Sequence, residues 1–127
     1  MATRGIIKIE GVNYAQIYKH WDCYPEHPKS AGTKSLFDWL EAFNKEFVEE
    51  RGDDPEYKFA QLLRASVRDA EEYNLDRSFT TGWGVVPYDA DYGEEYVYTL
   101  MKDGTVKCFS VHTDSEFVRF NRKGSNE

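Results

Sequence analysis

The sequence predicts an α+β domain: an antiparallel sheet of four or five strands, built from two hairpins, with two consecutive helices packed on one face. Three observations lead to this expectation. Apolar and polar residues alternate near both ends of the chain, the middle carries two stripes at helical spacing, and 127 residues suffice for one hydrophobic core. We assign residues 1–120 to a single domain and expect residues 121–127 to be a frayed tail.

The first hairpin is predicted from the N-terminal residues. Residues 4–10 place Ile7 and Ile9 on one face, which is the period-2 pattern of a half-buried strand. Residues 11–13, Gly-Val-Asn, supply turn residues, and the alternation resumes over residues 14–21. Two antiparallel neighbours are therefore expected at this end of the chain.

The first helix is predicted over residues 36–51. Its N-cap is Ser35, with Asp38 three positions further on, or alternatively Thr33, and Gly52 marks its end. The apolar residues recur at spacings of four, three and four: Leu36, Leu40, Phe43 and Phe47. This stripe predicts that one side of the helix is buried.

The second helix is predicted to begin at Asp54-Pro55, where Asp is a good N-cap and Pro suits the first helical position, and to end near Asn74. Its buried stripe comprises Phe59, Leu62, Leu63, Val67, Ala70 and Tyr73. Because only a few residues join the two helices, we expect them to be adjacent, roughly antiparallel and on the same face of the sheet.

The second hairpin is predicted within residues 96–111 around Asp103-Gly104, the strongest turn signal in the chain. A two-residue turn would pair Tyr98 with Phe109. A three-residue turn with a bulge would pair Tyr98 with Cys108. The sequence leaves both registers open.

Three segments remain to be placed around this hairpin. Residues 80–87 are expected to form a short strand in which Gly82 and Gly84 indicate a bulge or a close backbone approach. An acidic loop follows at residues 89–95, and residues 117–120 are compatible with one more short strand. The number of strands therefore stays at four or five.

The net charge is −7, and the acids are concentrated in the middle of the chain. Residues 1–35 carry a net +2, residues 36–101 carry −10 and residues 102–127 carry +1. An acidic surface repels phosphate backbones, so direct binding to nucleic acid is disfavoured, whereas a solvated helix face or mimicry of nucleic acid fits the pattern. The acids expected on this surface are Glu49, Glu50, Asp53, Asp54, Glu56, Glu71 and Glu72.

The two cysteines, Cys23 and Cys108, lie far apart and form no CxxC pair. The first residues do not resemble the apolar core of a signal peptide, and no apolar run approaches the roughly 18 residues that a membrane span needs. We therefore expect both cysteines to be reduced thiols in a cytoplasmic protein with no membrane attachment.

The densest group of chemically active side chains lies at residues 16–25, Gln-Ile-Tyr-Lys-His-Trp-Asp-Cys-Tyr-Pro. His20 and Asp22 would point the same way in an extended chain, and such a pair can act as a general base. Convergence of Arg4, Tyr18, His20 and Asp22 with residues 82–84 would favour an enzyme. The alternative is that His20 and Asp22 bond to each other or to nearby backbone and fix the loop.

A metal site is the next hypothesis for the same residues. His20, Asp22, Cys23, His27 and His112 are of types that bind zinc, but their spacing matches no standard finger or HExxH helix. A nucleophilic Cys23 that acts with His20 and Asp22 is a weaker hypothesis, because residues adjacent in the sequence rarely converge on one site without a sharp turn. We expect no metal and no cofactor.

Exposed aromatic residues are the third kind of candidate. Rings at strand or helix spacing mostly belong to cores, so loop tyrosines such as Tyr24, Tyr88 and Tyr92 are better contact candidates. The residues that we expect to contact a ligand or partner are Arg4, Tyr18, His20, Trp21, Asp22, Tyr24 and Trp83.

Four segments together resemble a family of small uncharacterised proteins from bacteria, archaea and their phages and viruses. These segments are Thr-Arg-Gly at residues 3–5, Tyr-Lys-His-Trp-Asp with the following Tyr-Pro-Glu at residues 18–26, Gly-Trp-Gly-Val at residues 82–85, and Glu-Tyr-Val-Tyr-Thr-Leu at residues 95–100. The resemblance runs over residues 3–111, and its most specific block is at residues 18–22. It implies a compact domain in a viral or mobile-element setting and no known activity. Cys23 departs from the glycine usual there, which puts a positive-φ turn at this position in doubt.

These observations favour a non-enzymatic, small cytoplasmic protein that binds a macromolecular partner, most simply a protein, or a small ligand. A homodimer is compatible with the sequence. One alternative is a small hydrolase or nuclease that uses His20 and Asp22. The other is an acidic DNA mimic that inhibits a nucleic-acid-binding protein of a host.

Overall fold

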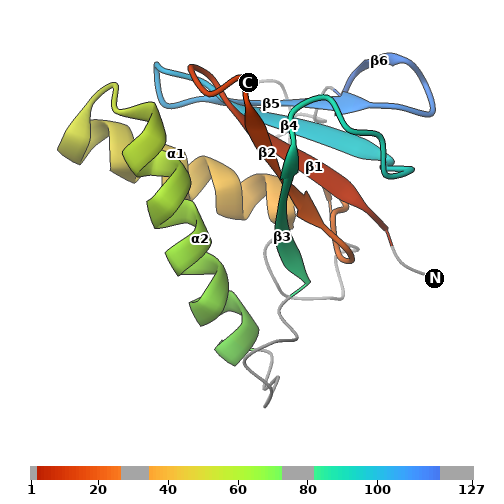
Figure 1. Ribbon diagram of the computed structural model, residues 1–127, viewed down its shortest axis with the longest axis horizontal. Coiled ribbons are helices and arrows are strands. Elements are labelled where there is room, and N and C mark those ends of the chain that lie inside the picture. Colours follow the sequence, from red (N-terminus) through yellow and green to blue (C-terminus); the bar gives the residue numbers. More distant parts are fainter. Residues whose placement is uncertain (1–2, 27–34, 73–81, 118–127) are drawn as a thin grey trace, which may run out of the picture.

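The computed structural model describes residues 3–26, 35–72 and 82–117, with the side chains of residues 67–72 left out (Figure 1). Within these ranges the chain forms two helices and one sheet. The elements are, in order, β1 (Gly5–Ile9), β2 (Ala15–Lys19), α1 (Leu36–Arg51), α2 (Pro55–Glu72), β3 (Trp83–Pro87), β4 (Tyr96–Leu100), β5 (Val106–Ser110) and β6 (Ser115–Glu116). The α+β class with two consecutive helices is confirmed.

The sheet is mixed and has six strands in the order β3-β2-β1-β4-β5-β6. All neighbours are antiparallel except β1 and β4, which run parallel, with Ile7 beside Tyr98. The expectation of four or five purely antiparallel strands is therefore wrong. β4 does not pair with β3, which precedes it in the chain, but crosses the sheet to lie beside β1, whose Ile6, Ile7 and Ile9 are all buried. A strand buried on both faces belongs in the centre of a sheet.

Both predicted hairpins are present. In the first, Ile7 pairs with Ile17, although β2 ends at Lys19 rather than at residue 21. In the second, Tyr98 pairs with Cys108, so the three-residue turn is the one that forms. The backbone N–H of Met101 donates to the Thr105 oxygen at 2.8 Å, and a glycine with φ +96° completes the turn.

α1 begins and ends, and α2 begins, as the local signals predict. The Ser35 hydroxyl accepts from the backbone N–H of Asp38 at 3.1 Å, and Gly52 closes α1 with φ +70° while donating to the Val48 oxygen at 2.9 Å. Pro55 opens α2. Several predicted features lie outside the described residues or side chains: the alternative cap Thr33, the helix end at Asn74, the metal candidate His27, the stripe residues Val67, Ala70 and Tyr73, residues 80–81 of the predicted strand and the tail at residues 121–127.

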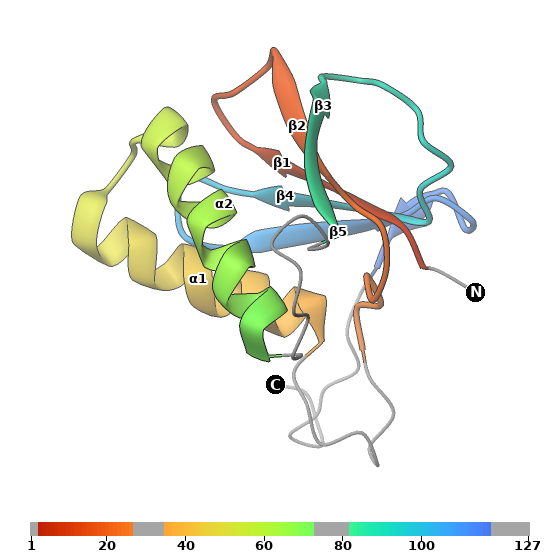
Figure 2. The same cartoon turned by 60° about the horizontal axis from the view of Figure 1, so that its bottom comes forward.

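The hydrophobic core lies between the helices and one face of the sheet (Figure 2). α1 packs against β4 and β5, and α2 packs against β1. Leu40 and Leu62 are fully buried from the helix side. On the sheet side the core contains Ile7, Ile9, Ile17, Tyr98, Leu100, Val106 and Cys108. Both helices therefore cover the same face, as predicted from their short connection.

Buried polar contacts attach the helices to the β4–β5 turn. The Asn44 amide, which is fully buried, donates to the oxygens of Met101 and Thr105 at 3.0 and 2.9 Å. The Lys58 ammonium lies 3.4 Å from the same Met101 oxygen, and burial lowers its pKa.

The last strand, β6, precedes the predicted segment at residues 117–120, of which residues 118–120 lie outside the described part. No described helix has the length and apolar content of a membrane span.

Candidate functional site

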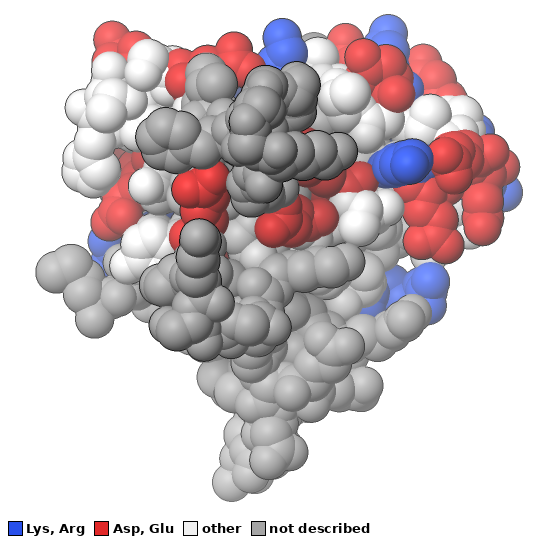
Figure 3. All heavy atoms as spheres, turned by 180° about the vertical axis from the view of Figure 1, so that it is seen from behind, with Lys and Arg blue, Asp and Glu red and all other residues white. Residues whose placement is uncertain are grey.

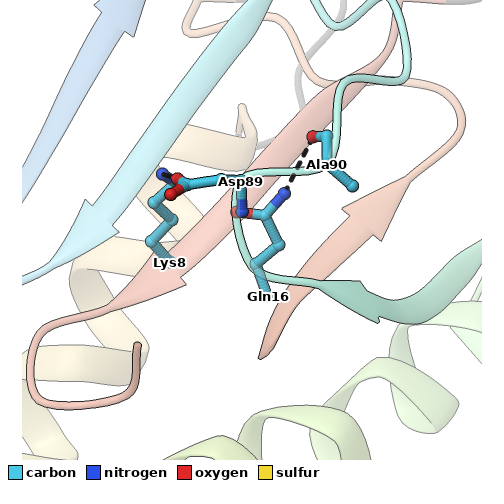
Figure 4. Close-up of polar contacts among 4 residues, drawn as sticks. All are labelled: Lys8, Gln16, Asp89 and Ala90. Carbon is cyan, nitrogen blue, oxygen red and sulfur yellow. Dashed lines mark hydrogen bonds and ion pairs between the residues drawn. The ribbon is translucent and has the colours of Figure 1, made fainter. Parts of the chain in front are cut away.

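The connection between β3 and β4, residues 88–95, lies on the face of the sheet opposite the helices. The side-chain amide of Gln16 on β2 makes two hydrogen bonds to this connection. Its Nε2 donates to the Ala90 oxygen at 3.1 Å, and its Oε1 accepts from the Asp89 N–H at 3.3 Å (Figure 4). Lys8 of β1 reaches the Asp89 carboxylate at 3.1 Å. Ile6, which also points away from the helices, is only 1% exposed. This second face of the sheet is therefore partly covered without a helix.

Four rings gather beside this loop, and we refer to Tyr18, His20, Trp21 and Tyr92 as the aromatic cluster. The Tyr18 hydroxyl lies 2.8 Å from His20 Nδ1, and the Tyr18 and Tyr92 ring centres are 5.2 Å apart. The ring of Trp21 meets that of His20 edge-on, with their centres 5.7 Å apart. Tyr92 is 42% exposed, and the other three rings are partly exposed. The cluster thus presents aromatic surface and hydrogen-bonding atoms to solvent.

Two glycines preceding and within β3 shape the border of the aromatic cluster. Gly84 pairs with Tyr18, so the two residues point to the same face of the sheet, and a Cβ built on Gly84 would meet no atom within 4 Å. At Gly82 a Cβ would lie 2.9 Å from Cζ2 of Trp21. Trp21 therefore packs directly on Gly82, whereas the space above Gly84 beside Tyr18 is open.

These two glycines allow a paired test of the geometry. We expect Gly82→Ala to lower the free energy of unfolding by about 1–3 kcal/mol, because φ at this residue is +82° and Trp21 must move. Gly84→Ala should be neutral or slightly stabilising, because it adds a methyl group to open space in a strand. Urea unfolding of both variants is the measurement, and equal losses would contradict the arrangement described here.

His20 and Asp22 do not form the expected pair. Within the described residues no hydrogen bond joins them: His20 bonds to Tyr18, and Asp22 is exposed with φ +60°. That expectation applied to an extended chain, whereas β2 ends at Lys19 and the backbone at Asp22 is left-handed. The positive-φ turn in this block falls on Asp22, which tolerates it without glycine. Convergence with residues 82–84 is partial: Tyr18 pairs with Gly84 and the His20 N–H donates to the Gly82 oxygen at 2.8 Å, whereas Asp22 is exposed.

Cys23 is buried under the end of the sheet. Its Sγ lies 3.4 Å from the Lys19 oxygen, and its own carbonyl accepts from the Tyr98 hydroxyl at 2.6 Å. Burial raises the pKa of this thiol to about 12, with Lys19 acting weakly in the opposite direction. A thiol of this kind is neutral and unreactive at neutral pH. The fit is tight, because a Cβ on Gly5 would lie 2.8 Å from the sulfur.

The remaining predicted contact residues fall on different surfaces. Arg4 is exposed and follows the alternation of Ile6, so it lies on the face of the aromatic cluster. Tyr24 is 45% exposed in the segment after β2. Trp83 is on the helix side of the sheet, where its ring centre lies 5.7 Å from that of Trp39. Trp83 therefore contributes to the core and does not share a surface with Tyr18.

The acidic residues form a separate surface at the α1–α2 turn, and Figure 3 shows acidic side chains gathered at that end of the molecule. Glu49, Glu50, Asp53 and Glu56 are exposed. Asp54 pairs with Arg51 at 3.2 Å, and Glu56 accepts from the Tyr14 hydroxyl at 3.2 Å. Tyr14 immediately precedes β2, whereas the aromatic cluster lies at the other end of that strand. Glu71 and Glu72 belong to the last turn of α2, and their side chains lie outside the described part.

In the described ranges, no group of three or more His, Cys, Asp or Glu side chains is placed to hold a metal ion. No family model, curated protein or solved structure matches the chain. The function is therefore argued from the site itself.

The sequence does not predict the role of Gln16 or the open space above Gly84. Gln16 follows the ordinary strand alternation, so nothing in its neighbours marks it as the residue that fastens the loop. From the sequence, Gly84 indicates only a bulge or a close backbone approach. The space above it depends on which residue of the neighbouring strand lies opposite, here Tyr18. Tyr92, a contact candidate because it lies in a loop of polar and acidic residues, is 42% exposed and packs on Tyr18.

Proposed function

We propose that this protein is a non-enzymatic binding protein that recognises a protein partner through the aromatic cluster and the open space above Gly84. The observation that carries the proposal is the exposed ring of Tyr92 packed on Tyr18, whose strand partner Gly84 is a position where an added Cβ would meet no described atom within 4 Å. Partly exposed aromatic rings around an open space are typical of contact surfaces. The viral or mobile-element setting implied by the resemblance is compatible with such a role.

The chemistry of the site favours binding over catalysis. His20 is hydrogen-bonded to Tyr18 and is not oriented by Asp22, and Cys23 is buried as a neutral thiol. The Tyr18 hydroxyl occupies the ring nitrogen Nδ1 of His20, where the predicted pair would place a carboxylate. The arrangement therefore gives the rival hydrolase or nuclease less support than it gives binding.

Electrostatics indicate which kind of partner is favoured. The net charge of −7 steers the protein toward basic surfaces and away from nucleic acid. The loop beside the aromatic cluster adds exposed carboxylates at Asp89 and Asp91. A partner protein with a basic contact surface matches both features.

The test is capture of partners from an extract of the source cells, with the bound proteins measured quantitatively for each variant. Gly84→Val places a branched side chain where a Cβ meets no atom within 4 Å, and Tyr92→Ala removes the exposed ring. We expect either change to reduce the captured partner about tenfold or more, as truncation or blocking of a contact centre does. Capture that is unchanged in both variants would refute the proposal.

The acidic mimic remains a second candidate because exposed acids gather at the α1–α2 turn (Figure 3). It predicts that reversing Glu49 and Glu50 to lysine abolishes a salt-sensitive interaction, whereas Gly84→Val has no effect. These acids and the aromatic cluster lie at opposite ends of β2, so the two sets of variants do not interfere with each other. The same capture experiment therefore separates the two functions.

A further inference from the structure

β3 is the terminal strand of the sheet, and its hydrogen-bonding pattern identifies which of its backbone groups face outward. The His20 N–H donates to the Gly82 oxygen, so His20 and Gly82 form a hydrogen-bonded pair. Hydrogen-bonded and non-hydrogen-bonded pairs alternate along an antiparallel ladder. Gly84 therefore bonds inward to Tyr18, and Val85 directs its N–H and carbonyl oxygen away from the sheet.

In the part of the chain that the structure describes, no feature that commonly protects an edge strand against pairing lies on the outer side of β3 at Val85. None of its five residues is charged, and Val85 is 54% exposed. Exposed edge strands commonly carry lysine, inward-pointing charges or a bulge, which hinder another strand from pairing. Within the described residues, no hydrogen bond engages the outward N–H or carbonyl of Val85. Only Pro87, at the end of the strand, restricts pairing.

This edge is continuous with the aromatic cluster. A strand added beside β3 would place the residue opposite Gly84 on the same face as Tyr18, because paired residues share a face. Its side chain would enter the space in which a Cβ on Gly84 meets nothing. An aromatic side chain fits this position best, since it covers the glycine and can pack against the ring of Tyr18.

We infer that the β3 edge accepts an extended segment of a partner protein as an added strand, with an aromatic side chain over Gly84 and basic side chains two residues to either side. The inference rests on the proposed function and specifies the partner chemistry of that same surface. The basic residues follow from the exposed carboxylates of Asp89 and Asp91 in the loop that succeeds β3. A second copy of this chain is disfavoured as the occupant, because each copy carries a net charge of −7.

The probe is a capped synthetic peptide, Thr-Lys-Val-Phe-Val-Lys-Thr, titrated into the folded protein by calorimetry and by amide NMR. Its phenylalanine is designed to lie opposite Gly84, and its lysines share that face. A second peptide has the same side chains but is N-methylated at both valines, which removes the backbone donors that face β3. We expect the second peptide to bind about tenfold more weakly or worse.

Two substitutions at one position make the matched comparison in the protein. Val85→Pro removes the outward N–H and leaves the ladder to β2 intact, as proline is tolerated at such positions of edge strands. Val85→Thr keeps the N–H and the shape of the side chain. We expect binding of the peptide to weaken about tenfold or more in Val85→Pro and to stay within about twofold in Val85→Thr. If Val85→Pro does not fold, the two peptides tested on the unaltered protein decide the question.

Each outcome is decisive. Failure of the unmodified peptide to bind the unaltered protein overturns the inference, and so does equal binding of the N-methylated peptide. If Gly84→Val weakens binding of the natural partner while Val85→Pro leaves it unchanged, strand addition is wrong but the proposed function stands. If the protein forms a dimer that Val85→Pro abolishes, the edge is occupied by a second copy, which overturns the choice of occupant.

Discussion

Between pH 9 and pH 12 we expect the protein to lose about 4 kcal/mol of its stability through Cys23 alone. The unfolded chain gives up the thiol proton near the ordinary pKa of 9.0, whereas burial keeps the thiol protonated in the folded protein until the pH approaches about 12. The unfolded state therefore binds fewer protons within this window, and stability falls as the pH rises. A pKa difference of about three corresponds to about 4 kcal/mol.

The measurement is urea unfolding at several alkaline pH values, compared with Cys23→Ser. Serine replaces the thiol with a hydroxyl that does not ionise in this pH range. The stability of Cys23→Ser should therefore depend less steeply on pH, even though the variant is less stable than the unaltered protein at neutral pH. Burial is the largest cause of the raised pKa of Tyr98 and acts in both proteins, whereas the smaller effect of Cys23 on that pKa is lost in Cys23→Ser. Parallel pH profiles for the two proteins would show that Cys23 ionises as easily in the folded state as in the unfolded state.

Leu40→Ala should cost about 2–5 kcal/mol of unfolding free energy, which is the range for truncating a fully buried leucine. Leu40 is 0% exposed and lies in the core between α1 and the sheet. Its removal leaves a cavity that the surrounding strands can fill only by moving. Thermal or urea unfolding measures the loss.

Leu63→Ala is the control for this substitution. Leu63 lies on α2 and packs against the same core, but it is only partly buried, so the same truncation removes fewer contacts. The loss in Leu63→Ala should be clearly smaller. Equal losses at both positions would mean that Leu40 is not at the centre of the packed core.

The hydrogen bond between Tyr98 and Cys23 connects this core to the candidate site. Tyr98 lies in the core on β4, and its hydroxyl donates to the carbonyl of Cys23, next to the residues that form the aromatic cluster. This hydrogen bond holds the segment after β2 from the helix side of the sheet. On the other side, Gln16 holds the connection between β3 and β4. The cluster is thus supported by contacts on both faces of the sheet, which keeps its rings in fixed positions, as a recognition surface requires.

The local elements were predictable because their causes lie within a few residues of each other. The cap of α1 at Ser35, its end at Gly52 and the start of α2 at Pro55 follow from side chains at fixed offsets. Both hairpins follow from alternation around turn residues, although only the structure chose the partner of Tyr98. The short link between the helices also predicted correctly that they share one face.

The amino-acid sequence by itself thus determined the two helices, the two hairpins and the buried side of α1. Only the tertiary structure decided that β4 lies parallel to β1, that His20 bonds to Tyr18 instead of Asp22, and that Tyr92 packs on Tyr18. The central parallel pairing and the ring contact join residues more than 70 positions apart. Periodicity and turn signals report local backbone preferences, whereas strand order and loop placement depend on which distant apolar surfaces bury each other best.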